Sequence, residues 1–127
     1  MEYKELQIGD WLITPWDAPI KVKAAHADHI EAEVKIGHTW SFGKNYHCFP
    51  MPLTPEILEK NGFKNNAGVC FQDFDTCRGK YRIGWNIDTH VVYVGYAELP
   101  NYFINVHEFQ NLLRVIGLRN IADNFIV

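Results

Sequence analysis

The feature that most constrains the fold is a strict alternation of apolar and charged residues in two neighbouring segments, 20–25 and 29–36. Successive side chains of a β-strand point to opposite faces, so this period of two predicts two strands with one buried and one solvated face. The apolar positions are Ile20, Val22, Ala24, Ile30, Ala32, Val34 and Ile36. With a short strand expected at 11–14, these segments are typical of the opening of a small SH3-like barrel.

A fourth strand is expected at 45–49, and strands at 69–74, 80–85 and 90–94 are expected to form a second antiparallel meander, with one more short strand at 102–104. Residues 37–44 and 64–68 indicate loops. Pro50 and Pro52 are expected to end regular pairing, because proline has no N–H to donate to a ladder. Aromatic residues make up 14% of the chain, and aromatic side chains favour strands.

Two short helices are predicted, at about 55–61 and 106–116. Thr54 is a suitable N-cap before Pro55, and Gly62 suits the left-handed position after the helix end. Asn105 is the expected N-cap of the second helix, with Glu108 as its capping-box partner. The second helix carries one apolar stripe, formed by Val106, Phe109, Leu112, Leu113 and Ile116.

These elements predict the α+β class: a small antiparallel SH3-like half-barrel or meander sheet with two short helices, in one domain over residues 1–127. The N-terminal residues lack the basic and apolar regions of a secretory signal, and no apolar stretch approaches the length of a membrane span. The odd count of three cysteines favours free thiols and a cytoplasmic location. The C-terminal residues 125–127 are expected to dock within the chain or against a second copy, which leaves a homodimer open.

Three segments of the chain carry a resemblance. They are LQIGDW at 6–11, MPLTPEILEKNGF at 51–63 and VHEFQNLLRVIGL at 106–118. In this order and spacing they resemble a group of small, uncharacterised proteins that are encoded in Bacteroidales bacteria and in their prophages or mobile elements. The resemblance implies a bacterial or phage-borne protein, and it carries no activity, cofactor or catalytic residue.

Zinc ligation is the first chemistry to test against the spacing. The candidate ligands are His47, Cys70 and Cys77, with Cys48 beside His47. Zinc sites usually contain a C-x₂₋₄-C pair, but six residues separate Cys70 from Cys77. Adjacent strand residues point to opposite faces, so His47 and Cys48 do not suit one ion. Buried thiols are the simpler interpretation, and no metal site is assigned.

Two polar groups leave alternatives open. His26 and His29 flank a turn with Asp28 between them, an arrangement suited either to a transition metal or to an ordinary polar turn. Asp73 and Asp75 share one face of a regular strand, where they would bind a divalent ion or form the exposed acidic end of a hairpin.

Catalytic motifs do not emerge from the sequence. His107-Glu108 begins like the zinc-protease pattern H-E-x-x-H, but Asn111 stands where the second histidine is required. Asp88 and His90 suit an acid–base pair, yet no nucleophile accompanies them. Nucleotide-binding glycine motifs and the G-x-S-x-G elbow are absent from the sequence. We therefore expect no enzyme and no cofactor.

Aromatic residues in expected loops are the strongest candidates for binding: Trp16, Trp40, Phe42 and Tyr46. Loop aromatics of a small barrel either grip a partner or fold back over the barrel ends. The leading hypothesis is a non-catalytic binding protein of a phage or mobile element that acts through an unknown protein partner.

Two rival hypotheses use the same aromatic set. A small-molecule or nucleotide binder, working as a sponge or sensor, would add Lys21, Lys23, Lys44 and Arg78 for an anionic group. A nucleic-acid-binding small barrel is the other, although the net charge of −3 argues against attraction to a phosphate backbone.

Overall fold

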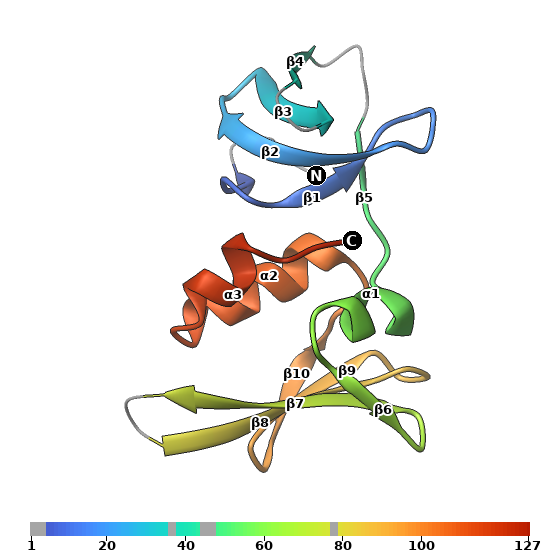
Figure 1. Ribbon diagram of the computed structural model, residues 1–127, viewed down its shortest axis with the longest axis vertical. Coiled ribbons are helices and arrows are strands. Elements are labelled where there is room, and N and C mark those ends of the chain that lie inside the picture. Colours follow the sequence, from blue (N-terminus) through green and yellow to red (C-terminus); the bar gives the residue numbers. More distant parts are fainter. Residues whose placement is uncertain (1–4, 36–37, 44–47, 77–78) are drawn as a thin grey trace. The chain divides into compact units, whose positions relative to one another are not determined.

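The computed structural model describes residues 5–35, 38–43, 48–76 and 79–127, and its backbone contacts divide the chain into two compact units (Figure 1). The first unit comprises the described parts of 1–52 and 105–125, with Val127. The second comprises the described parts of 53–104, with Ile126. Each unit is built on its own five-stranded antiparallel sheet, which places the chain in the α+β class. The single domain expected from the sequence remains a prediction, because two compact units can belong to one cooperative domain.

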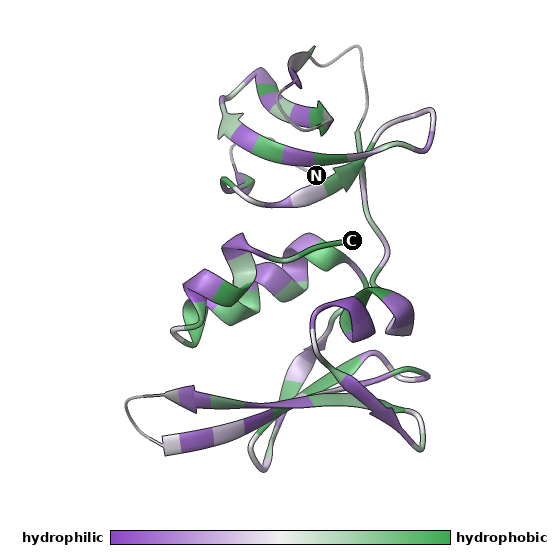
Figure 2. Cartoon of the chain, in the orientation of Figure 1, coloured by the Kyte–Doolittle hydropathy of each residue, from purple (hydrophilic) through white to green (hydrophobic). Residues whose placement is uncertain are grey.

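The sheet of the first unit has the strand order β4-β3-β2-β1-β5. Its strands are β1 (Trp11–Ile13), β2 (Pro19–Ala25), β3 (His29–Lys35), β4 (His38–Gly43) and β5 (Phe49–Pro50). The first four strands form a meander, and β5 returns to pair with β1. Figure 2 shows the alternation of hydrophobic and hydrophilic residues along β2, as the period of two predicts.

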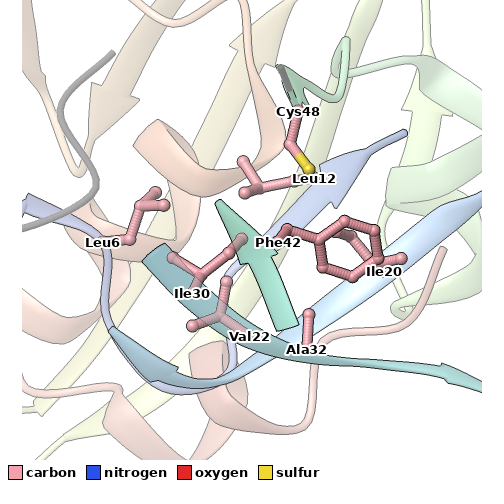
Figure 3. Close-up of a cluster of buried hydrophobic side chains, with 8 residues drawn as sticks. All are labelled: Leu6, Leu12, Ile20, Val22, Ile30, Ala32, Phe42 and Cys48. Atoms are coloured by element: carbon pink, nitrogen blue, oxygen red, sulfur yellow. The ribbon is translucent and has the colours of Figure 1, made fainter. Parts of the chain in front are cut away.

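The apolar face of this sheet forms the core of the first unit (Figure 3). The cluster consists of Leu6, Leu12, Ile20, Val22, Ile30, Ala32, Phe42 and Cys48. The register places Leu12 opposite Ile20 on neighbouring strands, so apolar side chains meet across the sheet. Burying each large side chain of this kind contributes roughly 1.5–3 kcal/mol, which makes the cluster the main source of stability for this sheet.

Two helices, α2 (Val106–Val115) and α3 (Arg119–Asp123), complete the first unit. Gln110 of α2 is fully buried, and its amide joins three segments. Its oxygen accepts from the backbone N–H of Trp11 at 3.1 Å. Its Nε2 donates to the carbonyls of Gly9 at 2.7 Å and of Ala122 at 2.9 Å. Because every bond is satisfied, this buried amide fixes the helices against β1 without a desolvation penalty.

Arg114 forms a second polar connection in the first unit. Its guanidinium is buried and contacts Asp10 at 2.5 Å and Asp123 at 3.1 Å. Gly9 lies directly beside it, with a φ of +96°, and a Cβ there would come within 3.3 Å of Arg114 Nη2. The glycine in the LQIGDW segment is therefore required by both backbone conformation and space.

The second unit contains α1 (Pro55–Lys60) and a sheet with the order β10-β9-β8-β7-β6. Its strands are β6 (Lys64–Asn66), β7 (Val69–Thr76), β8 (Gly79–Asn86), β9 (Val91–Val94) and β10 (Ala97–Tyr102). Strands β7 and β8 form a long hairpin, visible in Figure 1. One face of this sheet is buried through Cys70, Phe74, Ile83, Trp85 and Val92.

The start of α1 follows its sequence signals. Thr54 Oγ1 accepts from the backbone N–H of Ile57 at 3.2 Å, which confirms the predicted N-cap. Gly62 has a φ of +88°, and the N–H of Phe63 donates to the carbonyl of Leu58 at 3.1 Å. These contacts close the helix end as the glycine position predicted.

Several sequence predictions are corrected by the structure. Residues 38–43 form β4 rather than a loop, and 64–66 form β6. The predicted strand at 45–49 is reduced to β5 at 49–50, with 44–47 outside the described residues. The last strand is 97–102 and contains Pro100, which is tolerated because β10 lies at a sheet edge.

The C-terminal region also differs from expectation. An additional helix, α3, follows α2, and Phe125 is buried against Phe109 with ring centroids 6.2 Å apart. The carbonyl of Phe125 accepts from Trp11 Nε1 at 2.6 Å. The aromatic end of the tail thus docks within the first unit. Asn105 makes no side-chain cap, since its amide donates to Glu108 Oε1 at 2.6 Å instead.

Candidate binding surface

Trp16 lies at the tip of the hairpin between β1 and β2. The N–H of Asp17 donates to the carbonyl of Thr14 at 3.0 Å, which closes a β-turn with Pro15 and Trp16 at its centre. Asp17 then adopts a left-handed conformation with a φ of +64°. Ala18 bonds to both the backbone and the hydroxyl of the buried Thr14. This is the pattern of a three-residue hairpin loop, so the backbone that carries Trp16 is well defined.

Trp16 and Trp40 both meet the ring of Phe42. Their ring centroids lie 6.2 Å and 6.4 Å from that of Phe42. Trp16 is 52% exposed and Trp40 is 53% exposed, whereas Phe42 is only 2% exposed. Trp40 and Phe42 lie two positions apart in β4, which is one strand period, so their side chains share one face of the strand. We call Trp16 and Trp40 with Phe42 beneath them the tryptophan surface.

The sequence predicted that four aromatic residues lie in loops, and the structure places only one of the three that it describes in a loop. Trp16 is in a loop, and Trp40 is exposed but belongs to a strand. Phe42 belongs to β4 and to the core, among the eight side chains drawn in Figure 3, so its placement in a loop was wrong. Tyr46 lies outside the described residues.

The lysines suggested for an anionic ligand are engaged elsewhere. Lys21 Nζ lies 5.9 Å from the centroid of the Trp11 ring, and Lys23 Nζ lies 3.8 Å from a Glu33 carboxylate oxygen. Lys44 and Arg78 lie outside the described residues. The described part of the tryptophan surface is thus aromatic rather than cationic.

The cysteines have the character of buried thiols. Burial raises the pKa of Cys48 to about 11, and burial also raises the pKa of Cys70, followed by the nearby charges of Glu59 and Glu56. A raised pKa disfavours the thiolate that both nucleophilic attack and zinc ligation require. Among the described residues no group of three or more His, Cys, Asp or Glu side chains is arranged to hold a metal. His47 and Cys77 lie outside the described residues.

The His26–His29 group forms an ordered turn. The two imidazoles stack with centroids 4.3 Å apart, and His29 Nδ1 lies 2.7 Å from Asp28 Oδ1. His26 Nε2 lies 3.6 Å from Glu31. Stacking turns the rings face to face, and each histidine has its own carboxylate partner, so the arrangement is that of a polar turn.

The suggested acid–base residues have structural positions. The ring of His90 stacks on Trp85 with centroids 5.5 Å apart, and His90, which precedes β9, has a φ of +61°. Asp88 is exposed in the preceding turn. Nδ1 of His107 is buried without a hydrogen-bond partner among the described residues, and desolvation lowers the pKa of this histidine. His107 therefore stays neutral in the folded protein near physiological pH.

A second aromatic group, which sequence analysis did not predict, lies on the solvent face of the second sheet. Phe71 and Tyr93 belong to different strands and become neighbours only through pairing with β8. They line a hollow of about 280 Å³ together with Arg82 and Gly84. The one local signal is Gly84 in the middle of an alternating strand, a feature that often marks a close approach.

Comparisons with protein-family models, with curated proteins and with solved structures found no match. No described helix is long and apolar enough to cross a membrane. The geometry of the two aromatic groups is therefore the basis for functional inference.

Proposed function

We propose that this protein is a non-catalytic binding module that docks a protein partner on its tryptophan surface. The supporting observation is that two tryptophans, each more than half exposed, pack against one buried phenylalanine on a hydrogen-bonded scaffold. Large apolar side chains are usually buried in an isolated domain, and tryptophan is enriched at the energetic centres of interfaces. An ordered loop also limits the conformational entropy lost on binding.

The partner that suits this surface is an extended segment of another protein. Trp40 belongs to β4, which stands at one end of the strand order, with β3 as its paired neighbour. An edge strand offers backbone groups to an added strand, while side-chain contacts supply specificity. Trp16 and Trp40 would provide those side-chain contacts.

We further propose an SH3-like architecture for the first sheet and an accessory role in a phage or mobile element. A four-strand meander with a fifth strand returning to the first supports the SH3-like interpretation. The accessory role rests on the three-segment resemblance. Free Cys48 and Cys70 are consistent with a reducing cytoplasm.

The test compares the double variant W16A/W40A with wild-type protein. Peptides are selected from a display library against the wild type, and their affinities for each protein are measured by titration calorimetry. Phe49→Ala is the matched control, because Phe49 is a 50% exposed aromatic of the same sheet outside the tryptophan surface. We expect at least a tenfold loss of affinity in the double variant and none in the control. Equal affinity of all three proteins would refute the proposal.

A further inference from the structure

A single row of residues crosses the second sheet on its solvent face. Strand pairing aligns Lys64, Phe71, Gly84, Tyr93 and Glu98, one from each strand. Gly84 has no side chain, so the row has a gap between Phe71 and Tyr93. Phe71 and Tyr93 lie two strands apart, so their backbones are about 10 Å from each other. A ring placed between them would lie at a stacking distance from each.

The gap is a hollow of about 280 Å³ with Gly84 among its lining residues. A Cβ at Gly84 would lie 3.3 Å from Val69 Cγ1, so the bottom of the hollow is narrow. Phe71 and Tyr93 are both half-buried, which leaves part of each ring accessible. The shape therefore suits a flat ring entering between two aromatic walls.

Arg82 provides a fixed donor at the same place. Its guanidinium lies 4.5 Å from the centroid of the Phe71 ring and makes two bonds to Asp73, at 2.8 and 3.2 Å. Arg82 is nevertheless 59% exposed. A planar cation held flat on an aromatic ring can stack on a ligand or bind its phosphate.

A second hollow of about 610 Å³ adjoins the first and shares Arg82 and Gly95 with it. Tyr81, Tyr96 and Lys80 also line it. Aromatic side chains and the cations of Lys80 and Arg82 therefore lie around neighbouring hollows of the second unit. Asp73 and Asp75 of β7 and Glu98 of β10 offset the charge of these cations, so this face is not broadly basic.

Helix α1 leaves this face of the sheet uncovered. Phe63, at the end of α1, packs on Phe74 with centroids 5.9 Å apart, and Phe74 points to the buried face of β7. Phe71 is three residues earlier in the same strand and points to the opposite face. The hollow and the helix thus occupy different faces of one sheet.

We propose that the solvent face of the second sheet binds a nucleotide, with its base between Phe71 and Tyr93 above Gly84 and its phosphate on Arg82. Bases stack on aromatic side chains regardless of sequence, and Asn66 at the hollow offers an amide to a base edge. A free nucleotide and a single nucleic-acid strand share this chemistry. The site belongs to the second unit and does not depend on the tryptophan surface.

The test uses the full chain and two probes: a fluorescein-labelled oligothymidylate of about ten nucleotides, within the usual site size of small single-strand binders, and AMP. Anisotropy measures strand binding, and the rise in melting temperature measures AMP binding. We expect Tyr93→Ala and Arg82→Gln each to weaken binding about tenfold, the usual scale of one stacking contact. Asp73→Asn should strengthen binding, because it releases Arg82 and removes a negative charge.

Tyr102→Ala is the matched control, a 65% exposed tyrosine of the same sheet outside both hollows. Arg82 is exposed, so Arg82→Gln tests the site even where Tyr93→Ala weakens the fold. Binding of the oligonucleotide alone assigns the site to a nucleic-acid strand, and binding of AMP assigns it to free nucleotides. The proposal is overturned if wild-type protein binds neither probe, or if Tyr93→Ala and Arg82→Gln bind as tightly as Tyr102→Ala.

Discussion

The two sheets differ in the residue that lies at the centre, between their surface aromatic side chains: a phenylalanine in the first sheet and a glycine in the second. In the first sheet, Trp16 and Trp40 surround Phe42, whose ring fills the space beneath them. In the second, Phe71 and Tyr93 flank Gly84, a buried glycine without a side chain that helps to line a hollow of about 280 Å³. We propose that the rings around Phe42 dock a protein partner and that the hollow at Gly84 receives the ring of a ligand. The same residue type therefore indicates different binding modes in the two units.

Emptying the first centre should have the largest effect on stability. Phe42→Ala removes a 2% exposed ring from the core cluster and should lower the free energy of unfolding by about 3–5 kcal/mol. Urea denaturation followed by far-UV circular dichroism measures the change. A loss below about 1 kcal/mol, the range of surface substitutions, would mean that Phe42 does not support the tryptophans.

Filling the second centre should act on binding instead. Gly84→Val places a side chain between Phe71 and Tyr93, and it should reduce nucleotide binding at least tenfold. The free energy of unfolding should change by no more than about 1 kcal/mol, because β-branched residues favour strands while the contact with Val69 opposes the gain. Undiminished nucleotide binding by a folded Gly84→Val protein would contradict the assigned hollow.

Removing either tryptophan ring should lower stability much less than removing Phe42. Trp16→Ala and Trp40→Ala should each lower the free energy of unfolding by about 1 kcal/mol or less, since both rings are half exposed. Paired urea titrations against Phe42→Ala make the comparison direct. A cost of several kcal/mol would identify the tryptophans as core residues and remove the basis for a docking surface.

The smallest expected effect is a loss of stability in acid that depends on His107 in the first unit. The pKa of His107 is lowered by burial, so below the ordinary histidine pKa of about 6.5 the unfolded chain takes up a proton before the folded protein does. The free energy of unfolding should be undiminished above that pH and fall as the pH decreases through the folded pKa. His107→Gln should flatten this decline, whereas His38→Gln, at an exposed position of β4, should retain it. Equal acid dependence in both variants would show that His107 does not titrate with folding.

The regular parts of the fold were predictable because their signals are local. The alternation in β2 and β3 required only the two-residue strand period, and Thr54 and Gly62 bounded α1 through capping chemistry. Strand β4 was missed because most of its side chains are exposed, so its sequence lacks a buried face. Strand β6 has three exposed residues and owes its pairing to β7.

The candidate sites were likewise predictable only where the evidence for them is local in the sequence. The residue types at the tryptophan surface were visible from the chain, since Trp16 stands between two prolines. How deeply each of these side chains is buried could not be predicted. Phe42 is 2% exposed and Trp40 is 53% exposed, although they share one face of the strand. The hollow at Gly84 was missed altogether, since residues 71, 84 and 93 approach only through two strand pairings.

By itself, the sequence determined the α+β class, most of the strands and the helices α1 and α2, because the strand period, the Thr54 cap of α1 and the apolar stripe of α2 act between near neighbours. Tertiary structure alone decided that Gln110 and Arg114 are buried connectors, that Phe42 belongs to the core, and that Gly84 separates two aromatic walls. Those outcomes depend on register and on contacts across long stretches of chain. A side chain's neighbours in another strand are set by pairing, and no local pattern specifies them.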